Sequence, residues 1–332
     1  MRIAVDLLGG DHAPGEILLG VAGALRADFS PEDFLLIGPK EITESFFKEQ
    51  GIPDVPEIIH TDVFIAGDEK PIVALRAKPE ASISLAVKAM KEGRAQGLVA
   101  MGNTGAAVAA STMGLGMLKG IRRPAIAVTF RMAENSFILL DAGANPIPKP
   151  LHLFQYGLMG ESFARDIFDQ DRPRIALLNI GSEASKGSPL LQETYQLFSD
   201  SDFNFVGNIE GNHLFSGEAD VIVADGFSGN LALKVIEGFA EFLGQAARNL
   251  SDDDKNLRAS FRSLLGAADY SEVGGAILLG VNATVISGHG RSRANAVLSA
   301  IRFVREELQK GVNQHILQSA AAYPEPAKGS HD

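Results

Sequence analysis

Short runs of apolar residues, rich in isoleucine and valine, alternate along the chain with longer segments whose apolar positions recur at helical spacing. The short runs predict strands at 2–6, 34–38, 57–60, 97–101, 125–130, 137–141, 174–179, 204–208, 220–225 and 283–288. The longer segments predict helices at 15–27, 81–92, 104–118, 150–168, 189–199, 229–249, 255–266 and 292–309. Because the strand runs are apolar at nearly every position, both faces of the sheet should be covered. This is typical of an α/β fold with a mostly parallel sheet and flanking helices.

The length of 332 residues favours a single two-lobed domain, which we expect to span residues 1–318. Residues 319–332 form a polar, proline-containing tail that we expect to be disordered. Within the domain, residues 229–267 predict a pair of helices with Ser251 as the cap between them. Such a pair is consistent with a subunit contact or with an amphipathic surface for membrane docking, and packing into the core is the default interpretation.

Composition and charge narrow the classes of protein. The chain has no cysteine, so disulfides, thiolate metal sites and a cysteine nucleophile are excluded. No apolar run approaches the roughly 18 residues of a membrane span, and no apolar leader follows Met1. We therefore expect a cytoplasmic protein, with peripheral association at the inner face of the membrane as an extension of that expectation. The net charge of −11 argues against a nucleic-acid partner.

Basic residues are nevertheless concentrated in two short segments, and they are consistent with docking of an acidic partner. The three residues that we single out are Lys119, Arg122 and Arg123, with Arg291 and Arg293 as a second cluster. The alternative is that each of them is simply a solvated residue at a helix end or in a loop.

Five predicted strands end in loops made of Gly, Asn, Asp and Ser. The loops are "DLLGGDHAPG" (6–15), "MGNTGA" (101–106), "DAGAN" (141–145), "NIGSEASKGSP" (179–189) and "DGFSGN" (225–230). Ligands of open α/β sheets bind where such loops converge at the carboxyl ends of strands. Glycine lets the backbone approach a ligand, and a helix that begins after the loop directs free N–H groups towards it. The loops therefore predict a site for an anion.

Several common chemistries lack their sequence signatures. No loop has the P-loop pattern or a G-x-G-x-x-G, which removes the main support for ATP or a dinucleotide. No clustered histidines or carboxylates predict a catalytic metal. "GFSGN" lacks the G-x-S-x-G spacing of a nucleophile elbow, so Ser228 is a poor nucleophile candidate. Phosphate in a form other than ATP or a dinucleotide therefore remains as the candidate ligand.

Individual residues in these loops have two interpretations each. Lys186 and Lys234 could pair with phosphate oxygens, and Lys234 lies one helical turn beyond Asn230. His12 and His289 could be general acids or bases, or structural histidines. The aspartates at strand ends are expected to be caps or turn formers in at least half of the cases; they are Asp6, Asp11, Asp141 and Asp225.

In this order the loops resemble the bacterial phosphate acyltransferase (PlsX) family. The matching stretches are "GGDHAP" (9–14), "GNTGA" (102–106), "GIRRPAIA" (120–127), "LLDAGAN" (139–145), "LLNIGSEASKGSP" (177–189), "FVGNIEG" (205–211), "ADVIVADGFSGNLALKVIEG" (219–238), "DYSEVGGAILLG" (269–280) and "VISGHGRS" (285–292). They span nearly the whole chain to about residue 310. The family usually has "HGSS" where this chain has "HGRS", so the role of Arg291 is open.

The resemblance implies an enzyme that makes long-chain acyl phosphate from acyl-[acyl carrier protein] and inorganic phosphate, early in membrane phospholipid synthesis. It implies a two-lobed α/β fold related to isocitrate and isopropylmalate dehydrogenases and to phosphotransacetylases, a homodimer, and no cofactor or metal. A downstream membrane glycerol-3-phosphate acyltransferase is a further expected partner. The alternatives are an NAD-dependent decarboxylating dehydrogenase on the same fold and a non-catalytic acyl-carrier or phospholipid-enzyme binding protein.

Carried over position by position, the resemblance implies three groups of residues and no assigned general base. The catalytic group is Lys186, Asn230, Asp225 and Lys234. The substrate and phosphate-binding group is Gly9, Gly10, Asp11, His12, Asn103, Thr104, Gly105, Gly187, Gly226, Gly229, His289 and Gly290. The group that docks the acidic carrier protein is Lys119, Arg122 and Arg123.

Overall fold

The computed structural model describes residues 1–131, 135–248 and 274–323. Eleven strands of the described residues form one sheet, in the order β3-β2-β1-β4-β11-β10-β5-β6-β9-β7-β8. Their bounds are β1 Ile3–Asp6, β2 Phe34–Gly38, β3 Glu57–His60, β4 Gly97–Met101, β5 Ala125–Arg131, β6 Ser136–Leu140, β7 Ile175–Asn179, β8 Phe205–Glu210, β9 Val221–Val223, β10 Ala276–Leu279 and β11 Thr284–Gly288.

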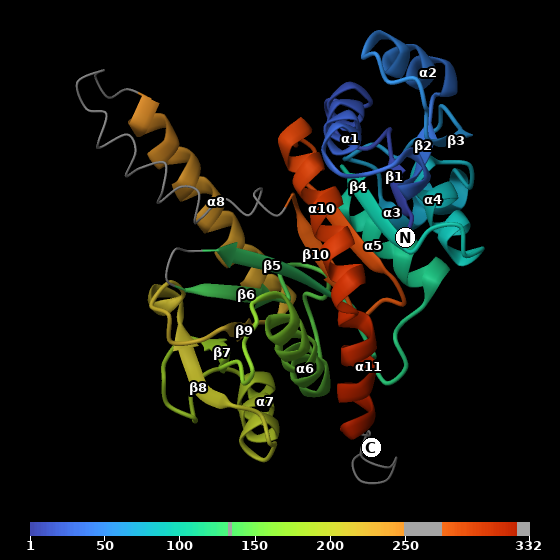
Figure 1. The fold of residues 1–332 in the computed structure, drawn as a ribbon. Coiled ribbons are helices and arrows are strands. Elements are labelled where there is room, and N and C mark those ends of the chain that lie inside the picture. The colour runs from blue at the N-terminus through green and yellow to red at the C-terminus, as the bar shows by residue number, and fades with distance from the viewer. Residues whose placement is uncertain (132–134, 249–273, 324–332) are drawn as a thin grey trace.

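Helices cover both faces of the sheet (Figure 1). One face packs against α1 (Gly15–Ala27), α2 (Lys40–Glu49), α6 (Pro150–Ile167), α7 (Pro189–Ser199), α10 (Ala294–Lys310) and α11 (Val312–Ala322). The other packs against α3 (Pro71–Ala77), α4 (Ser82–Lys91), α5 (Thr104–Leu115) and the start of α8 (Gly226–Arg248). Two 3₁₀ turns, Pro31–Asp33 and Gly211–His213, complete the described elements. Neighbouring residues of β1 alternate between the two layers, as the pleat requires.

The sheet consists of two parallel halves that run in opposite directions. β3, β2, β1, β4 and β11 are parallel, and so are β6, β9, β7 and β8. Between them, β11, β10, β5 and β6 pair antiparallel three times in succession. The register places Leu140, at the end of β6, level with Ala127, Ile277 and finally Ile286, near the end of β11. The carboxyl ends of the two halves therefore face each other across β10 and β5.

The predicted mostly parallel α/β fold is confirmed, and all ten predicted strands are present within a few residues. The prediction missed β10 and the helices α2, α3 and α11. The predicted helix at 229–249 begins three residues earlier, at Gly226, and its partner at 255–266 lies outside the described residues. α11 continues to Ala322, so residues 319–322 are helical rather than part of a disordered tail. Residues 324–332 of that tail also lie outside the described residues.

Candidate functional site

A cleft of about 540 Å³ lies where the carboxyl ends of the two halves meet. It is lined from the first half by the start of α5, the end of β11 and the loop that follows β11, and from the second half by the loop after β6 and by α8, with parts of α3, β5 and β10. Its lining residues are Pro71, Ile72, Thr104, Gly105, Val108, Ala109, Ile126, Ala142, Gly143, Ala144, Asn230, Leu233, Lys234, Glu237, Ala276, Ser287, Gly288 and His289. Five of the predicted site residues are therefore brought together: Thr104, Gly105, Asn230, Lys234 and His289.

The first turn of α8 is capped by Asp225. Its Oδ1 accepts hydrogen bonds from the N–H groups of Phe227 (3.0 Å) and Ser228 (2.9 Å), and its Oδ2 accepts one from the Ser228 hydroxyl (2.7 Å). The Gly226 N–H donates to the Asn145 carbonyl at 3.0 Å. Asp225 is thus a helix cap, and the Ser228 hydroxyl is held by that cap rather than by a base. Because these first-turn N–H groups have protein partners, α8 offers none of them to an anion.

The first turn of α5 differs in this respect. Asn103 caps it through a 2.9 Å bond from the Ala106 N–H to Asn103 Oδ1, and the Ala107 N–H donates to the Asn103 carbonyl. Within the described part of the chain, the N–H groups of Thr104 and Gly105 have no hydrogen-bond acceptor, and both residues line the cleft. The start of α5 therefore presents two backbone donors and the positive end of a helix dipole to the cleft.

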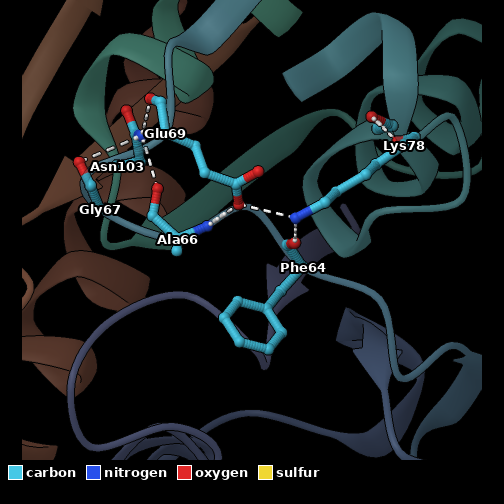
Figure 2. A network of polar contacts seen from close by, with 7 residues as sticks. Phe64, Ala66, Gly67, Glu69, Lys78 and Asn103 are labelled. Carbon is cyan, nitrogen blue, oxygen red and sulfur yellow. Dashed lines mark hydrogen bonds and ion pairs between the residues drawn. The ribbon is translucent and has the colours of Figure 1, made fainter. Parts of the chain in front are cut away.

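Asn103 also ties α5 to the segment that precedes α3 (Figure 2). Its Nδ2 donates to the carbonyls of Ala66 (2.9 Å) and Glu69 (3.2 Å). Glu69 in turn accepts from the Ala66 N–H and from Lys78 Nζ, each at 2.7 Å, and the Lys78 ammonium holds the pKa of this carboxyl below its usual value. Asn103 is therefore a structural residue that fixes the start of α3 beside Gly105.

The loop after β6 is organised around the buried carboxylate of Asp141. Oδ1 accepts from the N–H groups of Ile126 (2.9 Å), Gly143 (3.0 Å) and Ala144 (2.9 Å). Oδ2 accepts from the backbone N–H (2.6 Å) and the side-chain amide (3.3 Å) of Asn145. Burial raises the pKa of Asp141, and the backbone donors oppose that rise. Because all five partners are donors, both oxygens act as acceptors, as in the ionised form.

Gly229 and Gly226 let α8 approach this loop. A Cβ at Gly229 would lie 2.0 Å from the Asp141 carbonyl oxygen, and one at Gly226 would lie 2.7 Å from Asp141 Oδ2. Neither position has room for a side chain. The two glycines therefore place Asn230 at the edge of the cleft rather than contacting a ligand themselves.

The second half contributes three polar side chains to the cleft: those of Asn230, Lys234 and Glu237. Lys234 Nζ is 2.7 Å from Glu237 Oε2, and Asn230, one turn before Lys234, is exposed. Across the cleft, the Ser287 hydroxyl donates to Thr104 Oγ1 at 3.3 Å, and His289 follows two residues later. The Asn230 amide makes no hydrogen bond with any described residue. The cleft thus combines an ammonium group, an amide, an imidazole and the two N–H groups of α5.

The predicted residues of the first loop lie outside the lining of the cleft. The Asp11 N–H donates to the Gly290 carbonyl at 2.8 Å, and a Cβ at Gly9 would lie 1.8 Å from the Met101 carbonyl oxygen. Gly10 has a φ of 90°, a left-handed conformation that favours glycine. A cavity of about 20 Å³, large enough for a water molecule, separates Gly9 and the buried Asp6 from Ser287. His12 does not line the cleft either.

Lys186 and Gly187 also lie outside the cleft lining. Lys186 is half exposed, with its Nζ 3.8 Å from Glu183 Oε1, and Gly187 packs against the amide of Asn179. Their loop follows β7, which is one strand farther from the centre of the sheet than β9. The first loop follows β1, which is one strand beyond β4 on the opposite side. Strand order thus explains which predicted loops line the cleft.

Lys119, Arg122 and Arg123 are exposed in the segment that leads into β5. The Arg122 N–H donates to Gln155 Oε1 at 2.9 Å. Burial, Arg123, Lys149 and Arg122 together lower the pKa of His152. Lys149 therefore extends this basic region, which sequence reasoning had not included.

Sequence reasoning also missed the apolar wall of the cleft, formed by Pro71 and Ile72 of α3, Val108 and Ala109 of α5, and Leu233 of α8. Val108 and Ala109 follow Thr104 and Gly105 by four residues, so helical spacing alone places them on the same face.

No group of three or more His, Asp or Glu side chains in the described ranges is arranged to hold a metal ion. No described helix combines the length and apolar character of a membrane span.

Solved structures with this fold include two phosphotransacetylases. That of Streptococcus pyogenes matches with a TM-score of 0.61 and 20% identity over 92% of this chain and 94% of its own. The EutD phosphotransacetylase of Staphylococcus aureus matches with a TM-score of 0.59 and 16% identity over 97% and 94% of the two chains. At these identities the likeness shows the fold, and it confirms the expected relation to phosphotransacetylase structures.

Closer relatives are found by sequence. A protein of Listeria monocytogenes serotype 4a named phosphate acyltransferase is 42% identical over 325 residues, which cover 95% of each chain. A phosphate acyltransferase of Heliobacterium modesticaldum is 43% identical over 332 residues, covering 95% of this chain and 98% of its own. The family model described as "Fatty acid synthesis protein" matches residues 1–315. The predicted resemblance is thus confirmed, and the chain belongs to the fatty acid synthesis protein family, together with relatives named phosphate acyltransferase.

Proposed function

We propose that the protein transfers a long-chain acyl group from acyl-[acyl carrier protein] to inorganic phosphate, releasing acyl phosphate and free carrier protein early in membrane phospholipid synthesis. A phosphate oxygen attacks the thioester carbonyl carbon, and a tetrahedral oxyanion forms. The carbon–sulfur bond then breaks, and the leaving sulfur takes up one proton. Phosphate is already an anion at neutral pH, so the step depends on positioning and on stabilisation of charge.

The observation that carries this proposal is the position of the α5 start opposite Asn230 and Lys234. The N–H groups of Thr104 and Gly105 are unpaired among the described residues and lie in the same cleft as the Lys234 ammonium. Backbone donors at a helix start, together with a cation, form a suitable site for phosphate. The Asn230 amide is free to donate to the oxyanion of the tetrahedral intermediate. In this proposal His289 closes the site, and Asp225 acts through the capping of α8.

We assign Lys186 to the same reaction as a second cation, from the loop beside the start of α8. β7 and β9 are neighbouring parallel strands, so the loops that follow them leave the same edge of the sheet. Among the described residues, Lys186 Nζ pairs with the exposed Glu183 at 3.8 Å, and an exposed pair of this kind is weak. The ammonium can therefore exchange Glu183 for a phosphate oxygen at little cost.

The basic residues Lys119, Arg122 and Arg123 are proposed to dock the acidic carrier protein. They are exposed, and Lys149 and His152 lie in the same region. Attraction between oppositely charged surfaces raises association rates and weakens with salt. Charge reversal at Lys119 and Arg123 should therefore raise KM for acyl carrier protein and reduce its dependence on salt, while leaving kcat for saturating substrate nearly unchanged.

We also propose a homodimer in which α8 contributes to the subunit contact. Five apolar side chains with exposed fractions between 57% and 67% lie along α8: Phe227, Leu231, Val235, Phe239 and Phe242. An exposed apolar surface of this extent is typical of an interaction site. Light scattering of the wild type and of Phe239→Glu tests the proposal, and a monomeric wild type would contradict it. Binding of that monomer to anionic vesicles would instead favour peripheral membrane association.

The reaction is tested by incubating the protein with palmitoyl-[acyl carrier protein] and phosphate while free thiol and acyl phosphate are followed. Thiol release should require phosphate. Asn230→Ala should lower turnover at least about tenfold, since loss of one oxyanion donor can cost about a hundredfold. Lys186→Ala, which removes the proposed second cation for phosphate, should also lower turnover at least about tenfold. Asn212→Ala and Lys40→Ala, on exposed residues outside the cleft, are the matched controls. No phosphate-dependent thiol release from folded protein at several chain lengths would refute the function, and a signal dependent on NAD and a divalent metal would favour the dehydrogenase.

A further inference from the structure

The two walls of the cleft differ in chemistry. On one wall, α8 contributes Asn230, Lys234 and Glu237, together with one apolar side chain, Leu233. On the opposite wall, α3 and α5 contribute only uncharged residues, and beyond Thr104 and Gly105 these are apolar. A substrate with a polar reacting end and an apolar remainder fits such a division, because each part meets groups of its own kind.

The apolar wall is continuous along α5. Ala109 lies one helical turn beyond Gly105, and Met113 lies one turn beyond Ala109 on the same face. The rise from Thr104 to Met113 is about 14 Å along the helix axis. Met113 and, on α3, Ile72 are 59% and 51% exposed, respectively, so the wall continues to the protein surface as apolar side chains. The apolar wall thus leads from the N–H groups of α5 to solvent, and no ionisable side chain of α3 or α5 lies along it.

The wall is held in place by contacts already described. Asn103 joins α5 to the segment before α3, and Glu69 and Lys78 hold that segment (Figure 2). A Cβ at Gly105 would lie 2.7 Å from Pro71 Cγ, so the two helices are in contact at this point. Ala110 is buried, whereas Ala109 is partly exposed and lines the cleft. A larger side chain at position 109 would therefore project into the cleft rather than into the core.

Resting on the proposed function, we propose that the face of α5 bearing Val108 and Ala109, with Ile72 of α3, binds the acyl chain, and that the size of residue 109 limits the chain length. With the thioester carbonyl beside Asn230 and the start of α5, the chain runs along α5 towards Met113. The alanine at position 109 leaves the space that a long chain requires. Residue 109 is thus a specificity-determining residue that takes no part in bond making.

The test compares kcat/KM for palmitoyl- and octanoyl-[acyl carrier protein] in the wild type, Ala109→Phe and Ala109→Leu. One methylene more or less in an apolar pocket changes selectivity about 10- to 200-fold. Ala109→Phe should therefore lower kcat/KM for the palmitoyl substrate at least about tenfold while the octanoyl value changes less than about threefold. Ala109→Leu should shift the ratio in the same direction by a smaller factor, and it provides the result if the phenylalanine variant does not fold.

Ala321→Phe is the matched control, since Ala321 is an exposed alanine on α11 outside the cleft lining. Its palmitoyl-to-octanoyl ratio should equal that of the wild type. If the wild type is active and folded variants at position 109 keep that ratio, or lose both activities equally, the acyl site is refuted while the proposed function stands. If the wild type releases no thiol in response to phosphate with either substrate, the proposed function itself fails.

Discussion

Replacement of Asp141 by asparagine should destabilise the protein without changing the size of the side chain. Three N–H groups converge on Oδ1, and two from Asn145 converge on Oδ2. An asparagine can keep the first three by its carbonyl oxygen, but its amide then meets the two donors of Asn145 with donors of its own. A hydrogen bond to a charged group contributes about 1.5–3 kcal/mol, and a neutral amide costs less to bury than a carboxylate. The net loss should be about 2–4 kcal/mol.

That loss is a large share of a typical stability of about 5–15 kcal/mol, so urea denaturation followed by circular dichroism should resolve it. Asp62→Asn is the matched control, because Asp62 is largely exposed and its contact is a 3.6 Å pair with His60. The control should change the unfolding free energy by less than about 0.5 kcal/mol. A loss in Asp141→Asn no larger than in the control would refute the assignment of Asp141 as the group that holds the 141–145 loop.

Three further predictions follow from individual contacts. Gly229→Ala places a Cβ about 2.0 Å from the Asp141 carbonyl oxygen, so it should cost roughly 1–3 kcal/mol or more in urea denaturation and lower turnover, whereas Gly238→Ala, which meets nothing within 4 Å, should do neither. Asp225→Ala removes the α8 cap and should lower the free energy of unfolding by about 0.5–2 kcal/mol. Because the Ser228 hydroxyl bonds to that cap, Ser228→Ala should retain more than about half of the activity, whereas a loss of turnover of about a hundredfold or more would show that Ser228 reacts. Burial raises the pKa of Glu307 from 4.5 to about 8, so with rising pH the unfolded chain loses this proton first, and the free energy of unfolding falls between about pH 4.5 and 8. Glu307→Gln should remove that fall, so its gain in stability over the wild type should grow across this interval to at most about 5 kcal/mol. A gain that is independent of pH in denaturation curves would contradict this reasoning.

The strands were predictable because most of them are apolar on both faces. Each therefore stands out as an uninterrupted apolar run, and no alternation of apolar and polar residues had to be recognised. β10 was missed because four residues between two glycine-bearing turns carry little local signal, and its place between β11 and β5 depends on pairing with distant segments. α2 buries only Thr43 and Phe47, which is a weak stripe for a helix of ten residues. α11 was missed because the predicted helix ended at residue 309 and the residues from 319 onwards were assigned to the tail, whereas in the structure a single left-handed glycine, Gly311, separates α10 from α11.

The loops that could form the site were predictable, but which of them come together at the cleft was not. Each loop shows locally that a strand end meets a helix start, whereas convergence depends on strand order and direction. The loops that bear Thr104, Asn230 and His289 follow strands near the centre of the sheet, and the loops that bear His12 and Lys186 follow strands one place farther out. The sequence pattern also could not separate α5 from α8 as anion sites, because that depends on which first-turn N–H groups the protein itself uses.

The reversal of strand direction at β10 and β5 has a consequence for how the site works. Thr104, Gly105 and His289 belong to the first half of the sheet, whereas Asn230 and Lys234 belong to the second. The distance between the proposed phosphate donors and the proposed oxyanion donor is therefore set by the pairing of β11, β10, β5 and β6. A substitution in these strands can separate the two groups while each remains correctly folded in its own half. Substitutions in β10 are thus expected to lower turnover as substitutions in the cleft lining do, and also to lower stability, because Ile277, Leu278 and Leu279 are buried.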